Sequence, residues 1–321
     1  MNALRRAALA LAALGAAACA SAPPPDPRFR PSENVLEVVA VLRRHVPDDT
    51  YRFEPARDVT GRNVYRSTLL RLENLEKVYA DALRAGHWDD VIAFAKGRSF
   101  ERLRAFDLAA QSYRKVSDRT PELQRDARSS AALCDALDEA ARTGFDAARP
   151  PGEAEDVAAP LRSEHGVVEA SERRIALLEA LLPQAEGTQY TVIVKEEIER
   201  ADMARASFFV ASRKLTPDGD VRALSEQQRL VLRNRESKLA NTHVLGLADL
   251  YAAIADDYVK SHPPEGLLFD PPTFQELVDA ASRLYQSVAA QDGTPEKLAA
   301  SQRLEAFLAF TMKVDRDRFA Q

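Results

Sequence analysis

The side chains that could bind a metal ion are scattered along the sequence. His165 and Glu169 are four residues apart, the spacing that brings two ligands onto one face of a helix, but no two of the five histidines stand at such a spacing. Because a zinc site needs at least three protein ligands, this pair alone predicts no metal site. We expect the histidines to be solvated and the protein to hold no metal.

Nucleophiles give an equally weak signal. Ser112 and Lys115 have the Ser-x-x-Lys spacing of serine–lysine acyl enzymes, but those enzymes also need Ser-Asp-Asn and Lys-Thr-Gly motifs, which the sequence does not contain. With only 12 glycines and no glycine-rich phosphate or dinucleotide fingerprint, the sequence predicts neither a catalytic residue nor a cofactor.

Two carboxylate pairs, Asp89-Asp90 and Asp256-Asp257, could perform acid–base chemistry if they faced a cleft. We interpret them as solvated helix ends, since charged residues cluster there in ordinary soluble helices. A glycan-cleaving enzyme with one catalytic glutamate would leave no sequence motif, so an envelope enzyme is kept as an alternative function.

The N-terminus carries the most specific pattern in the chain. Arg5 and Arg6 precede an apolar run over residues 7–18, which is the arrangement of a secretory signal and is too short to span a bilayer. The run ends in Ala16-Ala17-Ala18-Cys19, which resembles the lipobox of bacterial lipoproteins, although Ala16 stands where that family prefers leucine. The alternative is an ordinary signal peptide with Cys19 incidental.

The lipobox resemblance implies cleavage after residue 18, lipidation of Cys19 with acyl chains such as palmitate, and a Pro-rich tether over residues 19–31. Ala20, rather than aspartate, after the cysteine implies the outer membrane of a Gram-negative cell. Cleavage would remove two arginines and lower the net charge from −5 to −7, which disfavours nucleic acid as a partner. Cys134, on an apolar helical stripe, would then be a buried core residue.

Nearly every remaining segment has apolar residues at helical spacing, and low glycine and aromatic contents disfavour a large β-barrel or sandwich. The predicted fold is therefore all-α. Besides a short helix near residue 35, the clearest predicted helices are Val64–Leu83, Ser171–Leu182, Thr188–Leu215, Ser225–Val259 and one from Glu296 onward. The fourth could be a single helix or break near residues 241–246.

Residues 89–123 read as two short helices followed by a proline. Their small and aromatic residues stand at the spacings of one tetratricopeptide repeat of 34 residues, with Ala93 and Lys96 departing from the usual pattern. This resemblance implies that two helices pack closely through Gly97, Phe100, Ala109, Tyr113 and Pro121.

A looser echo recurs near the C-terminus, where Ala281, Tyr285 and Val288 match Ala109, Tyr113 and Val116. We expect a second helical hairpin there, joined by a proline-rich loop over residues 261–272. From the N-terminus, we therefore predict a signal peptide (1–18), a tether (19–31), an N-terminal helical region (32–143) with one repeat at about 90–123, a linker (144–166) and a C-terminal helical region (167–321).

Together these patterns predict helical hairpins stacked in a tetratricopeptide-like α-solenoid behind a cleaved lipoprotein signal. The resemblance to tetratricopeptide lipoproteins, among them the outer-membrane subunit of β-barrel assembly machines, implies a non-catalytic envelope scaffold or adaptor that binds other envelope proteins. Alternatives are an envelope enzyme, a glycan-binding lipoprotein, or a pilotin-like accessory of a secretion or motility complex. The sequence leaves the oligomeric state open.

Overall fold

The computed structural model describes residues 63–86, 88–143 and 159–318, and the regular elements in these ranges are all helices. This confirms the predicted all-α fold. The chain divides into two compact units, residues 1–135 and 136–321. The predicted signal peptide, Cys19 and the tether lie outside the described residues.

The N-terminal unit contains consecutive helices that pack in chain order, α3 on α4 and α4 on α5. Asn63 caps the first of them, because its side-chain oxygen accepts hydrogen bonds from the backbone N–H groups of Tyr65 and Arg66 at 2.9 and 3.2 Å. The helices are α3 (Val64–Ala85), α4 (Trp88–Arg102), α5 (Phe106–Tyr113) and the first part of α6 (Pro121–Arg142).

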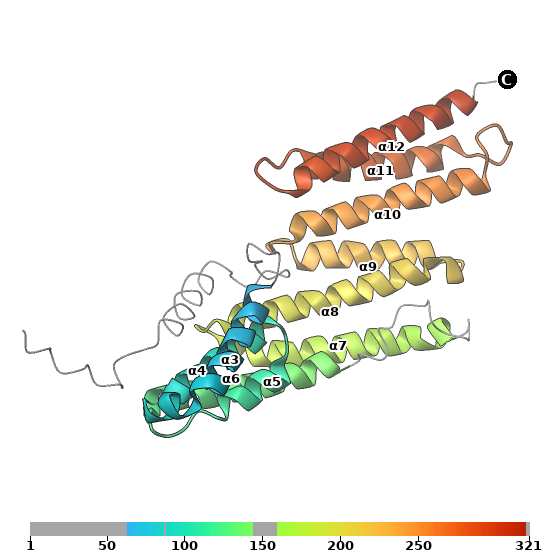
Figure 1. The fold of residues 1–321 in the computed structure, drawn as a ribbon. Helices are drawn as coiled ribbons and strands as arrows, with labels where there is room; N and C mark the ends of the chain where they lie inside the picture. The colour runs from blue at the N-terminus through green and yellow to red at the C-terminus, as the bar shows by residue number, and fades with distance from the viewer. Residues whose placement is uncertain (1–62, 87, 144–158, 319–321) are drawn as a thin grey trace, which may run out of the picture. The chain divides into compact units, whose positions relative to one another are not determined.

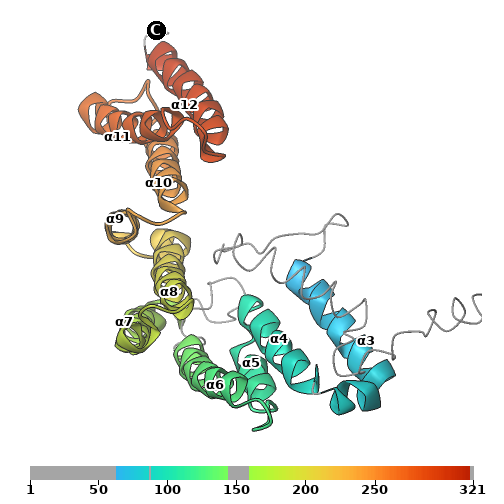
Figure 2. The same cartoon turned by 90° about the vertical axis from the view of Figure 1, so that its left-hand side faces the viewer.

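The C-terminal unit is a stack in which each helix packs against the next one in the chain, and α12 also contacts α10 (Figures 1 and 2). Buried residues from each of the last three helices, α10 to α12, form one apolar cluster. The helices are α7 (Ala159–Ala185), α8 (Tyr190–Ser212), a 3₁₀ turn η3 (Arg213–Leu215), α9 (Gly219–Arg233), α10 (Ala240–Ser261), α11 (Pro271–Ala289) and α12 (Glu296–Arg318).

Two predicted boundaries differ from the structure. Residues 159–166, expected in the linker, are helical, because Pro160 sits at the start of α7, where its missing N–H costs no hydrogen bond. The segment 225–259 forms two helices, but the break falls at residues 234–239, where the side chain of Asn234 bonds the carbonyl of Leu230 at the end of α9.

Candidate functional site

Helix α8 carries most of the polar interior of the C-terminal unit. It packs against α7 and α9 and hydrogen-bonds to α10, so that acidic side chains on several of its faces are buried. Glu197, Glu199 and Asp202 are at most 5% exposed. Burying a carboxylate without a partner costs free energy. Each of these three side chains therefore needs a group that pairs with it.

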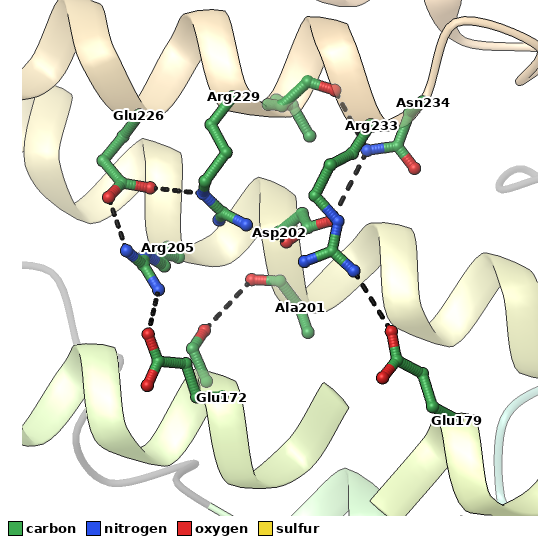
Figure 3. A network of polar contacts seen from close by, with 11 residues as sticks. Glu172, Glu179, Ala201, Asp202, Arg205, Glu226, Arg229, Arg233 and Asn234 are labelled. Atoms are coloured by element: carbon green, nitrogen blue, oxygen red, sulfur yellow. Dashed lines mark hydrogen bonds and ion pairs between the residues drawn. The ribbon is translucent and has the colours of Figure 1, made fainter. Parts of the chain in front are cut away.

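Asp202 is the most deeply buried of the three acids. Its Oδ1 accepts a hydrogen bond from Arg229 Nη1 at 2.8 Å, and its Oδ2 lies 3.5 Å from Arg233 Nε and from Asn234 Nδ2 (Figure 3). All three partners come from α9 or the residue after it. Asp202 therefore ties α8 to α9 through two positive charges.

Further ion pairs extend this contact to α7. Arg205 donates to Glu172 of α7 at 3.2 Å and to Glu226 of α9 at 2.6 Å, and Arg233 reaches Glu179 of α7 at 3.3 Å (Figure 3). Glu226 also accepts from Arg229 Nε at 2.8 Å. We call this set of seven charged side chains the α7–α9 charge network: Glu172, Glu179, Asp202, Arg205, Glu226, Arg229 and Arg233.

Two members of the network have pKa values shifted toward the charged form. Burial by itself raises the pKa of Glu226, but hydrogen bonds from Arg205 and Arg229 outweigh it and leave the pKa below its usual value. Burial likewise opposes the charge on Arg229, whereas Glu226 and Asp202 raise its pKa. The lowered pKa favours the charged form of Glu226, which suits its ion pairs with Arg205 and Arg229.

His243 of α10 is buried rather than solvated, so this part of the histidine prediction is wrong. Its Nε2 lies 2.5 Å from Oε1 of Glu199 on α8, and both side chains are almost inaccessible to water. The signal was available: His243, Leu247 and Leu250 stand at i, i+4 and i+7, and all three are buried.

The other two described histidines are His165 and His262. His165 is exposed and Glu169 pairs with Arg173 at 2.6 Å, while His262 stacks on Tyr258 with ring centroids 4.7 Å apart. No group of three His, Cys, Asp or Glu side chains within the described ranges could hold a metal ion. Among the same residues, no helix combines the length and the apolar character needed to cross a bilayer.

In the N-terminal unit, the structure brings Gly97 of α4 against Tyr113 of α5. A Cβ atom at Gly97 would lie 2.6 Å from the Tyr113 ring, and the Tyr113 hydroxyl donates to Oε1 of buried Glu101 at 2.6 Å. Ala109 is fully buried and Phe100 half-buried. Pro121 is exposed at the first position of α6, so it begins that helix rather than packing into the hairpin.

The Ser-x-x-Lys tetrad does not form a reactive pair. Ser112 is buried and its hydroxyl donates to the carbonyl of Leu108 at 2.8 Å. Lys115 is exposed beyond the end of α5. The nearby thiol of Cys134 is fully buried on α6, 3.7 Å from Glu101 Oε1.

Asp90, expected at a solvated helix end, is instead buried and holds the segment that follows α5. It accepts hydrogen bonds from the backbone N and the Oγ of Ser117 at 2.9 and 2.6 Å, while Arg119 binds its neighbour Asp89 at 2.5 Å. Burial raises the Asp90 pKa, but the hydrogen bonds from Ser117 and the charge of Arg119 together lower it by more. The net pKa therefore lies below its ordinary value. Asp90 is thus an ionised structural clamp.

Asp257 has the same role at the end of α10. It pairs with Arg213 at 2.5 Å and Lys214 at 2.9 Å, which connect it to the turn after α8. Burial raises its pKa, and the bonds from Lys214 and Arg213 reverse that effect, leaving the pKa below its ordinary value. Both carboxylate pairs therefore contribute one member to helix packing.

Comparison with known proteins adds no relative from which a role could be carried over to these residues. No protein-family model matches the chain. No curated protein resembles it significantly in sequence.

Proposed function

We propose that this chain is a lipid-anchored scaffold of the bacterial cell envelope that binds other envelope proteins through its helical array. The observation that carries the proposal is the packing of α7 to α12, in which each helix contacts its neighbour in the chain. Arrays of this kind expose extended surfaces built from many helices, and such surfaces bind proteins without chemistry.

The use of the buried acidic residues supports binding over catalysis. Asp90, Glu199 and Asp202 each hold two chain segments together through hydrogen bonds to partners on another element. Their carboxylates are committed to the fold, and where the pKa is shifted, as in Asp90, the shift favours the charged form. A scaffold needs this rigidity to present one fixed surface.

The membrane anchor in the proposal is Cys19. Residues 1–18 have the charged-then-apolar pattern of a secretory signal, and Ala16-Ala17-Ala18-Cys19 resembles a lipobox. Several acyl chains on one cysteine give a stable attachment, since each buried methylene adds about 0.8 kcal/mol. The Pro-rich residues 19–31 would then be an extended tether between lipid and helices, facing the periplasm from the outer membrane.

Metabolic labelling with a palmitate analogue tests the anchor. The chain and its Cys134→Ala variant should incorporate label and accumulate unprocessed in globomycin, whereas Cys19→Ala should lose label and leave the membrane fraction. Cys134→Ala is the matched control because it removes the other cysteine of the sequence. Unchanged labelling and fractionation of Cys19→Ala would refute the proposed lipid anchor.

Crosslinking in intact cells tests the scaffold itself. Purification from membranes after crosslinking should recover a defined set of envelope proteins with the anchored chain and much less of it with Cys19→Ala. The same preparation should leave peptidoglycan intact. Peptidoglycan hydrolysis by the purified chain would overturn the proposal in favour of an envelope enzyme.

A further inference from the structure

Residues 262–270 form the loop between α10 and α11 (Figure 1). This loop carries two adjacent leucines that are exposed to solvent. Leu267 is 104% exposed and Leu268 80%, the highest values among the large hydrophobic side chains that the structure describes. Single exposed leucines are ordinary on protein surfaces, but two adjacent ones at the tip of a loop form an apolar knob. Pro263-Pro264 near the start of the loop and Pro271-Pro272 directly after it restrict its backbone.

The loop is built to hold this conformation. The hydroxyl of Tyr258 accepts a hydrogen bond from the backbone N–H of Asp270 at 2.8 Å, which joins the end of α10 to the start of α11. The Tyr258 ring stacks on His262, and Phe269 packs against both Tyr258 and Phe274 at centroid distances of 5.7 and 5.6 Å.

The contacts of the neighbouring loop residues set the direction of the two leucines. Phe269 is partly buried and packs against the apolar cluster of α10, α11 and α12, whereas the two residues before it face solvent. The N–H of Gly266 bonds the carbonyl of Pro263 at 2.8 Å and fixes the turn on the other side. An apolar group already held in place loses little conformational freedom on binding, which favours its use as an anchor.

The charges beside the knob are acidic. Glu265 is exposed two residues before Leu267. Asp270 is exposed two residues after Leu268 and also caps α11, because its side chain accepts a hydrogen bond from the backbone N–H of Thr273 at 3.4 Å. The nearby Lys260 is paired with Asp256 at 2.5 Å. Acidic groups are repelled by anionic lipid surfaces, so a membrane is a poor match, and a cationic protein surface is a good one.

We infer that the α10–α11 loop is the docking element of this protein and inserts Leu267 and Leu268 into an apolar pocket, rimmed by Lys or Arg, on a partner protein. The inference rests on the proposed scaffold function and names the part of the array that makes the contact.

Photo-crosslinking in intact cells tests it. The full chain carrying p-benzoylphenylalanine in place of Leu268 should crosslink to one partner protein, and the crosslinked peptide should be apolar with Lys or Arg close by in the partner. The control carries the same group in place of Leu298, which is 67% exposed on α12, and should give less than a tenth of that product. Products with lipid only, with a second copy of the chain only, or equal at both positions would overturn the inference.

A charge exchange then tests the acidic rim. Glu265→Lys should reduce the crosslinked product at least tenfold, and a Lys→Glu or Arg→Glu change at the crosslinked site of the partner should restore most of it. The thermal midpoint should stay unchanged, since Glu265 is exposed. An unchanged yield with Glu265→Lys would refute the charge match.

The result also separates this inference from the function on which it rests. If the anchored chain recovers envelope partners but the group at position 268 forms no partner crosslink, the scaffold survives and the docking element is elsewhere. If neither experiment recovers a partner, both proposals fail.

Discussion

Replacing Gly97 by alanine should destabilise the N-terminal unit, although alanine is the better helix former. The methyl carbon would lie 2.6 to 2.8 Å from three carbons of the Tyr113 ring, about 1 Å inside an ordinary carbon–carbon contact. The ring has little freedom to move, because Tyr113 is buried, its hydroxyl is bound to Glu101 at 2.6 Å, and Phe94 packs against it at 5.2 Å.

Two opposing effects set the size of the change. Glycine to alanine inside a helix is worth about 1 kcal/mol of added stability through backbone entropy. Forcing a methyl group into a packed contact costs about 1–3 kcal/mol. Because a rigid ring is the obstacle, we expect the upper part of that range and a net loss of about 1–2 kcal/mol in the free energy of unfolding.

The chain contains a convenient reporter for this unit. Trp88 is the single tryptophan of the sequence, and it stands at the start of α4, the helix that carries Gly97. Urea unfolding followed by tryptophan fluorescence therefore monitors the N-terminal unit, while far-UV circular dichroism monitors all helices. Gly97→Ala should lower the fluorescence midpoint more than the midpoint of the C-terminal unit.

Gly246→Ala on α10 is the matched control. It makes the same chemical change inside a helix, but the nearest atom to the new methyl group is Gln227 Oε1 at 3.8 Å, an ordinary contact. We expect it to leave stability unchanged or raise it by up to about 1 kcal/mol. If Gly97→Ala behaved like Gly246→Ala, or if adding Tyr113→Leu did not reduce its penalty, the close approach of α4 and α5 would be refuted.

The remaining predictions concern charge. Asp202→Asn should cost about 1–3 kcal/mol of unfolding free energy, because a neutral amide would replace the buried carboxylate that pairs with Arg229 and Arg233. Glu169→Gln at an exposed pair should cost less than about 1 kcal/mol, and equal urea midpoints for the two variants would contradict this. The lowered pKa values of Asp90, Glu226 and Asp257 mean that their stabilisation is complete above the ordinary glutamate pKa of 4.5 and is lost as the pH falls below it. Urea midpoints measured between pH 7 and 3 should therefore fall once the pH drops below 4.5. A flat profile would argue against a stabilising role of these three carboxylates.

The helices were predictable from the sequence because apolar periodicity is a local signal. Val64–Leu83 appears as α3, and the β-branched segment Tyr190–Lys195 is helical as predicted because its apolar stripe continues at a helical period. Local signals were misleading where a residue type is common in two kinds of structure, as proline is in loops and at the start of helices. Pro160 reads as a loop residue but occupies the start of α7.

The polar interior could not be predicted, because the partner of a buried charge lies on another helix. Glu197, Glu199 and Asp202 are charged, yet α8 is covered on more than one face and buries all three. A sequence shows which residues share a face of one helix. It does not show that Asp202 lies opposite Arg229, 27 residues later.

These buried charges have a physical use in an array of this composition. Alanines contribute to its interior, and five of them are almost completely buried: Ala201, Ala206, Ala223, Ala248 and Ala255. Such small side chains give shallow ridges, which allow helices to approach closely but oppose sliding only weakly.

A slide by one helical turn would move a side chain by about 5.4 Å and separate Asp202 from both of its arginines. The His243–Glu199 contact fixes α10 against α8 in the same way. We therefore interpret the apolar contacts as the main source of stability. The buried ion pairs select one alignment of α7, α8, α9 and α10, and they can do so even where their net stabilisation is small.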